Sequence, residues 1–208
     1  MTVVLLDAGQ QWSGLSTDSK PSSSVSPGAL FFETDTQRVF MHNGTSWFHH
    51  LAGAGSGFTS SVTITRPANT TPYTANDVVG GALEFASIGP AGALLTVLDL
   101  VLQLRITANP GAAMTTFRLH LYNVTPPGAL ADNAAFDVPA GDQASHLGMI
   151  KGLTVEDLGS TVHAEASGIA KSVRLASTSL FAYLVTDAAY TPAANSEVYV
   201  LTAHGVVL

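Results

Sequence analysis

Cysteine is missing from this sequence of 208 residues. Without thiols the chain can form neither disulfide bonds nor thiolate metal sites, so both of these ways to stabilise a fold are excluded. Hydrophobic residues make up 46% of the chain, which is enough for a substantial buried core. The fold must therefore be held by packing and by contacts between copies.

Charged residues are also scarce, at 11% of the chain, and such a charge-poor surface is typical of a protein that works in an assembly. The sequence contains 8 Lys and Arg against 15 Asp and Glu, which gives a net charge of -7. Because binding to phosphates requires clustered basic residues, this composition excludes nucleic acid as a partner.

No apolar run is long enough for a membrane helix. The longest one, residues 91–101, is interrupted by Gly92 and Asp99, whereas a membrane helix needs about 20 apolar residues. The apolar start of the chain, residues 3–6, lacks the basic segment and the cleavage site of a signal peptide. We therefore expect no membrane partner and no signal peptide.

Residues 94–124 have the clearest pattern in the chain. Apolar and polar side chains alternate in two stretches, separated by Asn109-Pro110-Gly111. Alternation with a period of two indicates β-strands, and the Pro-Gly pair indicates a turn. We therefore expect a long antiparallel hairpin with its leucines in the core: Leu98, Leu100, Leu102, Leu104, Leu119 and Leu121.

The part of the chain after residue 58 reads as strands separated by turn residues, with no long helical stripe. Strands are expected at residues 61–66, 82–88, 94–107, 115–124, 147–153, 172–176, 180–186 and 197–208. Residues 155–170 are compatible with a short helix or a loop. This pattern predicts a jelly-roll-like antiparallel β-sandwich for residues 58–208.

The N-terminal residues, 1–52, predict a separate small module. An aperiodic segment up to Pro27 reads as an extended arm or a loop, and three short strands with tight turns follow it as a β-meander. A Gly-rich connector, residues 51–57, then separates the module from the sandwich. Because so small a unit buries little apolar surface alone, we expect it to associate with other chains.

Residues that could carry chemistry do not form a recognisable site. His42, His49 and His50 are close in sequence but lack the ligand spacing of a zinc site, so we interpret the histidines as surface or hydrogen-bonded groups. No nucleophile motif with a partner histidine is present, and the acidic loops match no calcium-binding pattern. We therefore expect no enzymatic activity, no cofactor and no metal.

Aromatic residues are dense in the meander: Phe31, Phe32, Phe40, Trp47 and Phe48. Such a cluster suits either the core of an oligomer or a platform on which a sugar ring stacks. We favour contacts between copies of the chain, because aromatic anchors dominate the energetics of protein interfaces.

Two sets of motifs resemble phage proteins. The first contains residues 15–21 (LSTDSKP), 27–36 (PGALFFETDT) and 43–47 (NGTSW), and it resembles a module found in virion proteins of tailed bacteriophages, including head fibres and tail fibres. The second contains residues 66–73 (RPANTTPY), 78–80 (VVG), 132–136 (DNAAF) and 189–193 (AYTPA), and it resembles uncharacterised phage structural proteins.

The resemblance implies a non-enzymatic virion structural protein located on the capsid surface. The first hypothesis is a capsid decoration (cement) protein that binds the major capsid protein through residues 1–52 and forms a homotrimer. The alternative is a protein of a head fibre or tail fibre that binds a receptor, with a host glycan as its ligand. The resemblance transfers no catalytic residues.

Overall fold

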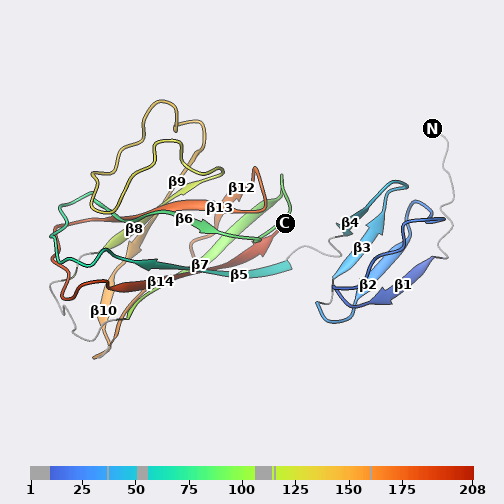
Figure 1. The fold of residues 1–208 in the computed structure, drawn as a ribbon, viewed down its shortest axis with the longest axis horizontal. Helices are drawn as coiled ribbons and strands as arrows, with labels where there is room; N and C mark the ends of the chain where they lie inside the picture. Colours follow the sequence, from blue (N-terminus) through green and yellow to red (C-terminus); the bar gives the residue numbers. More distant parts are fainter. Residues whose placement is uncertain (1–9, 37, 51–55, 106–113, 115, 160) are drawn as a thin grey trace. The chain divides into compact units, whose positions relative to one another are not determined.

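The computed structural model describes the chain except for residues 1–9, 37, 51–55, 106–113, 115 and 160. The described residues form β-strands and turns without a helix, which confirms the all-β class. They belong to two compact units, Met1–Ser56 and Gly57–Leu208 (Figure 1). No helix long and apolar enough to span a membrane occurs in this part of the chain.

The N-terminal unit is a four-stranded sheet with the order β1-β2-β3-β4. Strands β2 (Leu30–Glu33), β3 (Val39–His42) and β4 (Trp47–His50) pair antiparallel in sequence order, as the meander pattern predicts. A further strand, β1 (Gln11–Gly14), pairs parallel to β2. This strand lies in the segment expected to be an extended arm or a loop. The sequence does not indicate a strand there, because these four residues have no repeated alternation of apolar and polar side chains.

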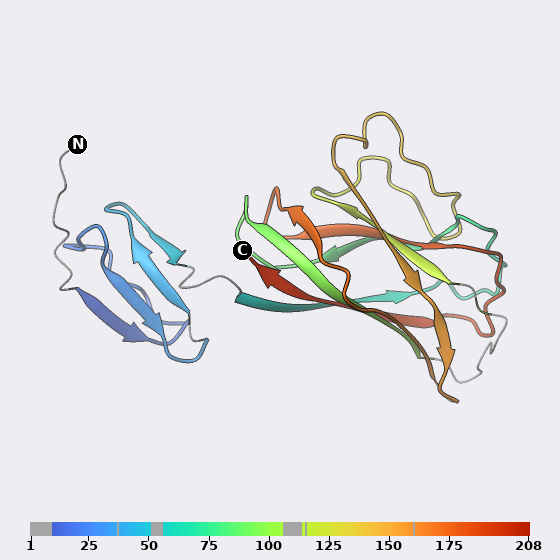
Figure 2. The same ribbon diagram turned by 180° about the vertical axis from the view of Figure 1, so that it is seen from behind.

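The C-terminal unit contains two sheets packed face to face (Figure 2). The larger sheet has the order β10-β11-β7-β14-β5, with β12 also paired to β7, and the smaller one has the order β6-β13-β8-β9. The strands are β5 (Ser56–Thr65), β6 (Val78–Phe85), β7 (Leu94–Arg105), β8 (Phe117–Tyr122), β9 (His146–Leu153), β10 (Val155–Asp157), β11 (Thr161–Ala166), β12 (Lys171–Arg174), β13 (Leu180–Thr186) and β14 (Val198–Val207).

The order of the strands is that of a jelly roll. Early strands pair with late ones in a nested series: β5 with β14, β6 with β13, β7 with β11, and β8 with β9. A chain that folds back on itself as one long hairpin and then rolls up produces this nesting, with alternate pairs in opposite sheets. The predicted jelly-roll-like sandwich is therefore confirmed.

The core lies between the two sheets and is filled by side chains that alternate inward from both of them. The leucines of β7 and β8 provide much of it, which confirms five of the six predicted core positions. The central members are Leu100, Leu102, Leu104, Leu119, Leu121, Ala182, Leu184, Tyr199 and Leu201.

The predicted hairpin of residues 94–124 is wrong. Strand β7 pairs with β14, β11 and β12 in the larger sheet, whereas β8 pairs with β13 and β9 in the smaller one. The turn signal at Asn109-Pro110-Gly111 falls outside the described residues. Alternation identifies which side chains face a core, but a turn that crosses between two sheets has the same residue types as a hairpin turn.

Leu98 is the predicted core residue that the structure places outside, with 38% of its surface exposed. Opposite it, the register of β14 changes between His204 and Gly205, so Leu98 is an extra residue in β7. Such a β-bulge shifts the alternation by one position, and Leu95 and Val97 are buried before it. A Cβ on Gly205 would lie 2.3 Å from the Thr96 carbonyl oxygen, so the bulge requires glycine there.

The described part of residues 155–170 contains two strands, followed by irregular backbone at residues 167–170, in place of the short helix or simple loop expected there. Strands β10 and β11 form an antiparallel pair there, and β11 also pairs with β7. The pattern was ambiguous because the inward residues of β11, Val162 and Ala164, are few and small.

The connection between β8 and β9, residues 123–145, covers the outer face of the smaller sheet. A second apolar cluster lies between them, with Tyr122, Tyr183 and Val185 from the sheet and Leu130 and Phe136 from the connection. The larger sheet has no comparable cover among the described residues, so the two outer faces of the sandwich differ.

Candidate interaction surface

One face of the N-terminal sheet carries an aromatic cluster that the chain covers itself. Phe31 is 3% exposed, and its ring centroid lies 6.0 Å from that of Trp47. Trp47 also contacts Trp12 and His42, with ring centroids 5.8 and 5.1 Å away. These side chains come from β1, β2, β3 and β4, so strand alternation brings them to the same face.

Lys20 closes this face. Its Nζ lies 4.1 Å from the ring centroid of Phe40 and 5.0 Å from that of Phe31, and it forms an ion pair of 2.7 Å with Glu33 Oε1. Nearby, the Trp47 Nε1–H donates to the Pro21 carbonyl oxygen at 2.6 Å. Lys20 and Pro21, in the segment expected to be an extended arm or a loop, therefore pack onto the sheet of their own chain.

Glu33 is buried beside Lys20. Partial burial opposes ionisation, but hydrogen bonds from Lys20 and Thr36 outweigh it and lower the pKa of Glu33. The carboxylate therefore remains charged and anchors the covering segment.

The opposite face of the same sheet is apolar and uncovered among the described residues. Phe32 is 41% exposed and Phe48 is 42% exposed. We call the five apolar residues of this surface the apolar face: Leu30, Phe32, Val39, Met41 and Phe48. By strand register Gln11 and Ser13 of β1 and His50 of β4 flank them on the same side of the sheet. Because none of the five is ionisable or a hydrogen-bond donor, the apolar face suits another apolar surface.

The structure thus divides the five aromatic residues predicted as contacts. Phe31 is buried within its own chain, and Phe40 and Trp47 are half-buried under the covering segment. Phe32 and Phe48 are the two that remain on a surface. Sequence reasoning missed this division because it did not foresee that residues after β1 fold back over the sheet.

His42, His120 and His146 are hydrogen-bonded within the fold, which is one of the two environments expected for the histidines. His42 is buried, and its Nδ1 accepts a hydrogen bond of 3.2 Å from the Gly44 amide. His120 is also buried and shares a hydrogen bond of 3.2 Å with His146. The described residues contain no group of three or more His, Cys, Asp or Glu that could hold a metal ion.

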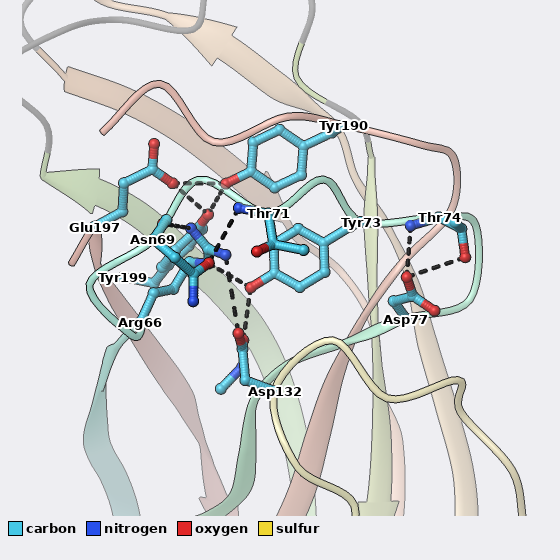
Figure 3. A network of polar contacts seen from close by, with 11 residues as sticks. Arg66, Asn69, Thr71, Tyr73, Thr74, Asp77, Asp132, Tyr190, Glu197 and Tyr199 are labelled. Atoms are coloured by element: carbon cyan, nitrogen blue, oxygen red, sulfur yellow. Dashed lines mark hydrogen bonds and ion pairs between the residues drawn. The ribbon is translucent and has the colours of Figure 1, made fainter. Parts of the chain in front are cut away.

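A buried polar network joins three connections at one end of the sandwich (Figure 3). Arg66, which is 2% exposed, donates from Nε to the Tyr73 hydroxyl at 2.5 Å. That hydroxyl donates to Asp132 Oδ1 at 2.6 Å, and the Gly80 amide donates to the same oxygen at 2.7 Å. The network therefore ties the β5–β6 connection to the β8–β9 connection.

Stacking extends this network to the β13–β14 connection. The Tyr73 and Tyr190 rings stack with centroids 5.4 Å apart, and the Tyr190 hydroxyl donates to Glu197 Oε2 at 2.6 Å. Tyr199 donates to the same oxygen at 3.0 Å. Burial raises the pKa of Tyr73, Tyr190 and Tyr199, so their hydroxyls stay protonated and act as donors.

This arrangement stabilises the loops and offers no reactive group. The phenols donate to carboxylates, and these carboxylates also accept backbone amides, so none of the groups is free to act as a base or nucleophile. The motifs at residues 66–73 and 189–193 contain three of its members. Sequence reasoning recorded these motifs only as a resemblance, because spacing along the chain does not reveal that they meet.

Comparison with known proteins gave weak likenesses. No protein-family model and no characterised protein matches the sequence. Among solved structures, the capsid of Ralstonia phage GP4 is similar at 17% identity and a TM-score of 0.38, over 76% of this chain and 88% of that one. The structure of mud crab dicistrovirus is similar at 12% identity and a TM-score of 0.27, over 74% of this chain and 68% of that one.

A third similar structure is the native virion of Kashmir bee virus at acidic pH. It matches at 15% identity with a TM-score of 0.25, over 92% of this chain and 95% of that one.

Proposed function

We propose that this chain is a non-enzymatic structural protein of a phage virion, a decoration (cement) protein that binds the surface of the head. In this proposal the N-terminal unit holds three copies together through the apolar face and binds the major capsid protein, and the sandwich is displayed outward. The resemblance of residues 15–47 to a module of phage virion proteins supports the assignment to a virion.

The observation that carries the proposal is the apolar face. A sheet with one face filled by its own chain and the other left apolar is incomplete as an isolated unit, because exposed apolar surface is unfavourable in water. Phe32 and Phe48 are the aromatic residues available on it. Five adjacent apolar side chains favour a protein contact, whereas a sugar would have to use the polar residues that flank them by register, Gln11, Ser13 and His50.

The test compares full-length variants for binding to heads that lack the protein. Phe32→Ser with Phe48→Ser should reduce occupancy, because these aromatic residues anchor the contact between copies and loss of the trimer removes multivalent attachment to the head. The matched control is Leu158→Ser, which removes an exposed leucine from the other unit.

Normal occupancy by the double variant would contradict the proposal. Bound copies should number tens to hundreds per particle by gel densitometry against the major capsid protein. A few copies per particle would instead favour the alternative, a receptor-binding or glycan-binding protein of a fibre.

A further inference from the structure

Strand β5 is the outermost strand of the larger sheet, with β14 as its neighbour (Figure 1). The Arg66 amide donates to the Glu197 carbonyl oxygen at 3.0 Å, which fixes the side of the chain that faces β14. Backbone groups of successive strand residues alternate in direction, so the amides of Thr63 and Thr65 point to the outer edge. Two side-chain contacts to β14, Ser61 with Thr202 at 2.8 Å and Thr59 with His204 at 3.1 Å, agree with this register.

An outer strand with unpaired backbone groups is a template for another strand, and proteins usually protect such edges with charges, bulges or shortness. Strand β5 has ten residues and contains neither proline nor an ionisable residue. Its odd-numbered residues from Gly57 to Thr65 are all exposed. The edge therefore has none of the usual protection.

The other outer strands of the described sandwich each carry such protection. Strand β6 is irregular at Gly80, which has a φ of 85°, and contains Glu84. Strand β9 pairs irregularly with β8 and contains Lys151. Strand β10 has three residues, two of them acidic, and β12 begins with Lys171 and ends with Arg174. Among the outer strands of the described sandwich, β5 is therefore the one best suited to pair with another strand.

We propose that β5 pairs with β5 of a second copy, antiparallel about a twofold axis, so that one continuous sheet runs through both copies. The net charge of -7 makes two copies repel over most of their surfaces, and β5 is a neutral stretch where they can approach. Twofold pairing also places hydroxyl side chains of Thr59, Ser61 and Thr63 beside their counterparts, a favourable cross-strand arrangement. This contact is independent of the proposed virion function.

A single pair of strands is a narrow contact, smaller than the roughly 800 Å² per partner of a stable interface. We therefore expect the pair to form at high protein concentration and to open on dilution. Crowding of copies on a surface would favour it through effective concentration.

The absence of cysteine permits a direct test by cross-linking. Thr59→Cys, Ser61→Cys and Thr63→Cys each introduce a unique thiol at the edge of the full-length protein. Directly opposite residues in a hydrogen-bonded antiparallel pair have Cα atoms about 5.5 Å apart, within the range of about 4.4 to 6.8 Å for disulfides. Gln103→Cys is the matched control, since Gln103 is exposed on β7, and β14 separates β7 from β5.

On mild oxidation, at least one edge variant should form a covalent dimer about tenfold faster than Gln103→Cys. Adding Thr63→Pro to the Thr59→Cys or Ser61→Cys variant removes an amide that faces the edge and keeps the hydrogen bonds to β14. The variant should then form the covalent dimer no faster than Gln103→Cys. Thr63→Lys, which places like charges face to face, is a second blocking variant in case the proline variant unfolds. Equal rates at the edge and at position 103, or dimers that persist in both blocked variants, would overturn the proposal.

Discussion

Lys20 stabilises the N-terminal unit through a single side chain, because it lies over two aromatic rings and neutralises the buried Glu33. Lys20→Met keeps the apolar stem but leaves the carboxylate without its cation. We expect the unit to lose about 1 to 3 kcal/mol of stability. The two tryptophans of the chain, Trp12 and Trp47, lie in this unit, so tryptophan fluorescence during urea unfolding reports on it selectively.

The double variant Lys20→Met with Glu33→Gln removes both charges together. It should recover most of the lost stability, because no buried charge is then left unpaired. If the single and double variants unfolded at the same urea concentration, the ion pair would not be the stabilising feature.

His120 makes the sandwich sensitive to acid. Burial, then the neighbouring His146, Arg118 and Lys151, lower its pKa to about 4 from the ordinary value of 6.5. Between pH 6.5 and pH 4 the unfolded chain binds a proton at this histidine and the folded chain does not. The protonation of His120 therefore lowers the free energy of unfolding only below about pH 6.5. This free energy falls by up to about 3 kcal/mol as the pH drops toward 4.

Calorimetry of the full-length protein between pH 7 and pH 4.5 checks this expectation. His120→Gln cannot titrate, yet it retains a hydrogen-bonding group for His146, so its unfolding temperature should depend less on pH than that of the wild type. His163→Gln, at a half-buried histidine of β11, is the control and should leave the wild-type dependence in place. The same acid dependence in His120→Gln and the wild type would show that His120 is not its source.

At the scale of elements, the bulge in β7 separates two leucines that look equivalent in the sequence. Leu102 is buried in the core, whereas Leu98 is largely exposed. Leu102→Ala should therefore cost about 2 to 5 kcal/mol, the usual range for a cavity in a core, and Leu98→Ala should cost well under half of that. Urea unfolding followed by circular dichroism measures both, and equal losses would contradict the bulge.

Strand positions could be predicted from the sequence because apolar and polar side chains alternate along most of β7, β8 and β14. The partners of each strand could not. Alternation depends on which face is buried, while pairing depends on where the chain turns between sheets, and the Asn109-Pro110-Gly111 signal is the same in both cases. The extra residue at Leu98 was equally hidden, since it requires knowing that Gly205 lies opposite.

The candidate site was predicted as a cluster of aromatic residues, but its division into two faces was not. Phe31 is buried and its neighbour in sequence, Phe32, is exposed. The alternation of side chains along a strand predicts that the two lie on opposite faces. Which of the two faces is covered depends on Lys20 and Pro21 folding back, and that segment has no periodicity to reveal it. The polar network around Arg66 was missed for a similar reason, because its members come from three separate connections.

At the scale of the whole molecule, the apolar face determines the expected assembly. Four strands spaced about 4.8 Å apart, each with four residues rising about 3.3 Å, give a sheet face of roughly 250 Å². This is well below the roughly 800 Å² per partner of a stable interface, so one face-to-face contact would be weak. Around a threefold axis each copy contacts two others, and three faces enclose a common core.

We therefore predict a homotrimer in solution. At low micromolar concentration, where the narrow β5 contact is open, sedimentation equilibrium should give about three times the chain mass of 21.5 kDa. Phe32→Ser with Phe48→Ser removes the aromatic anchors of the apolar face and should give monomers with the circular dichroism of the wild type. Leu158→Ser should remain trimeric. A wild-type protein that sediments only as 21.5 kDa monomer would contradict the trimer, and a trimeric double variant would show that the apolar face does not hold it together.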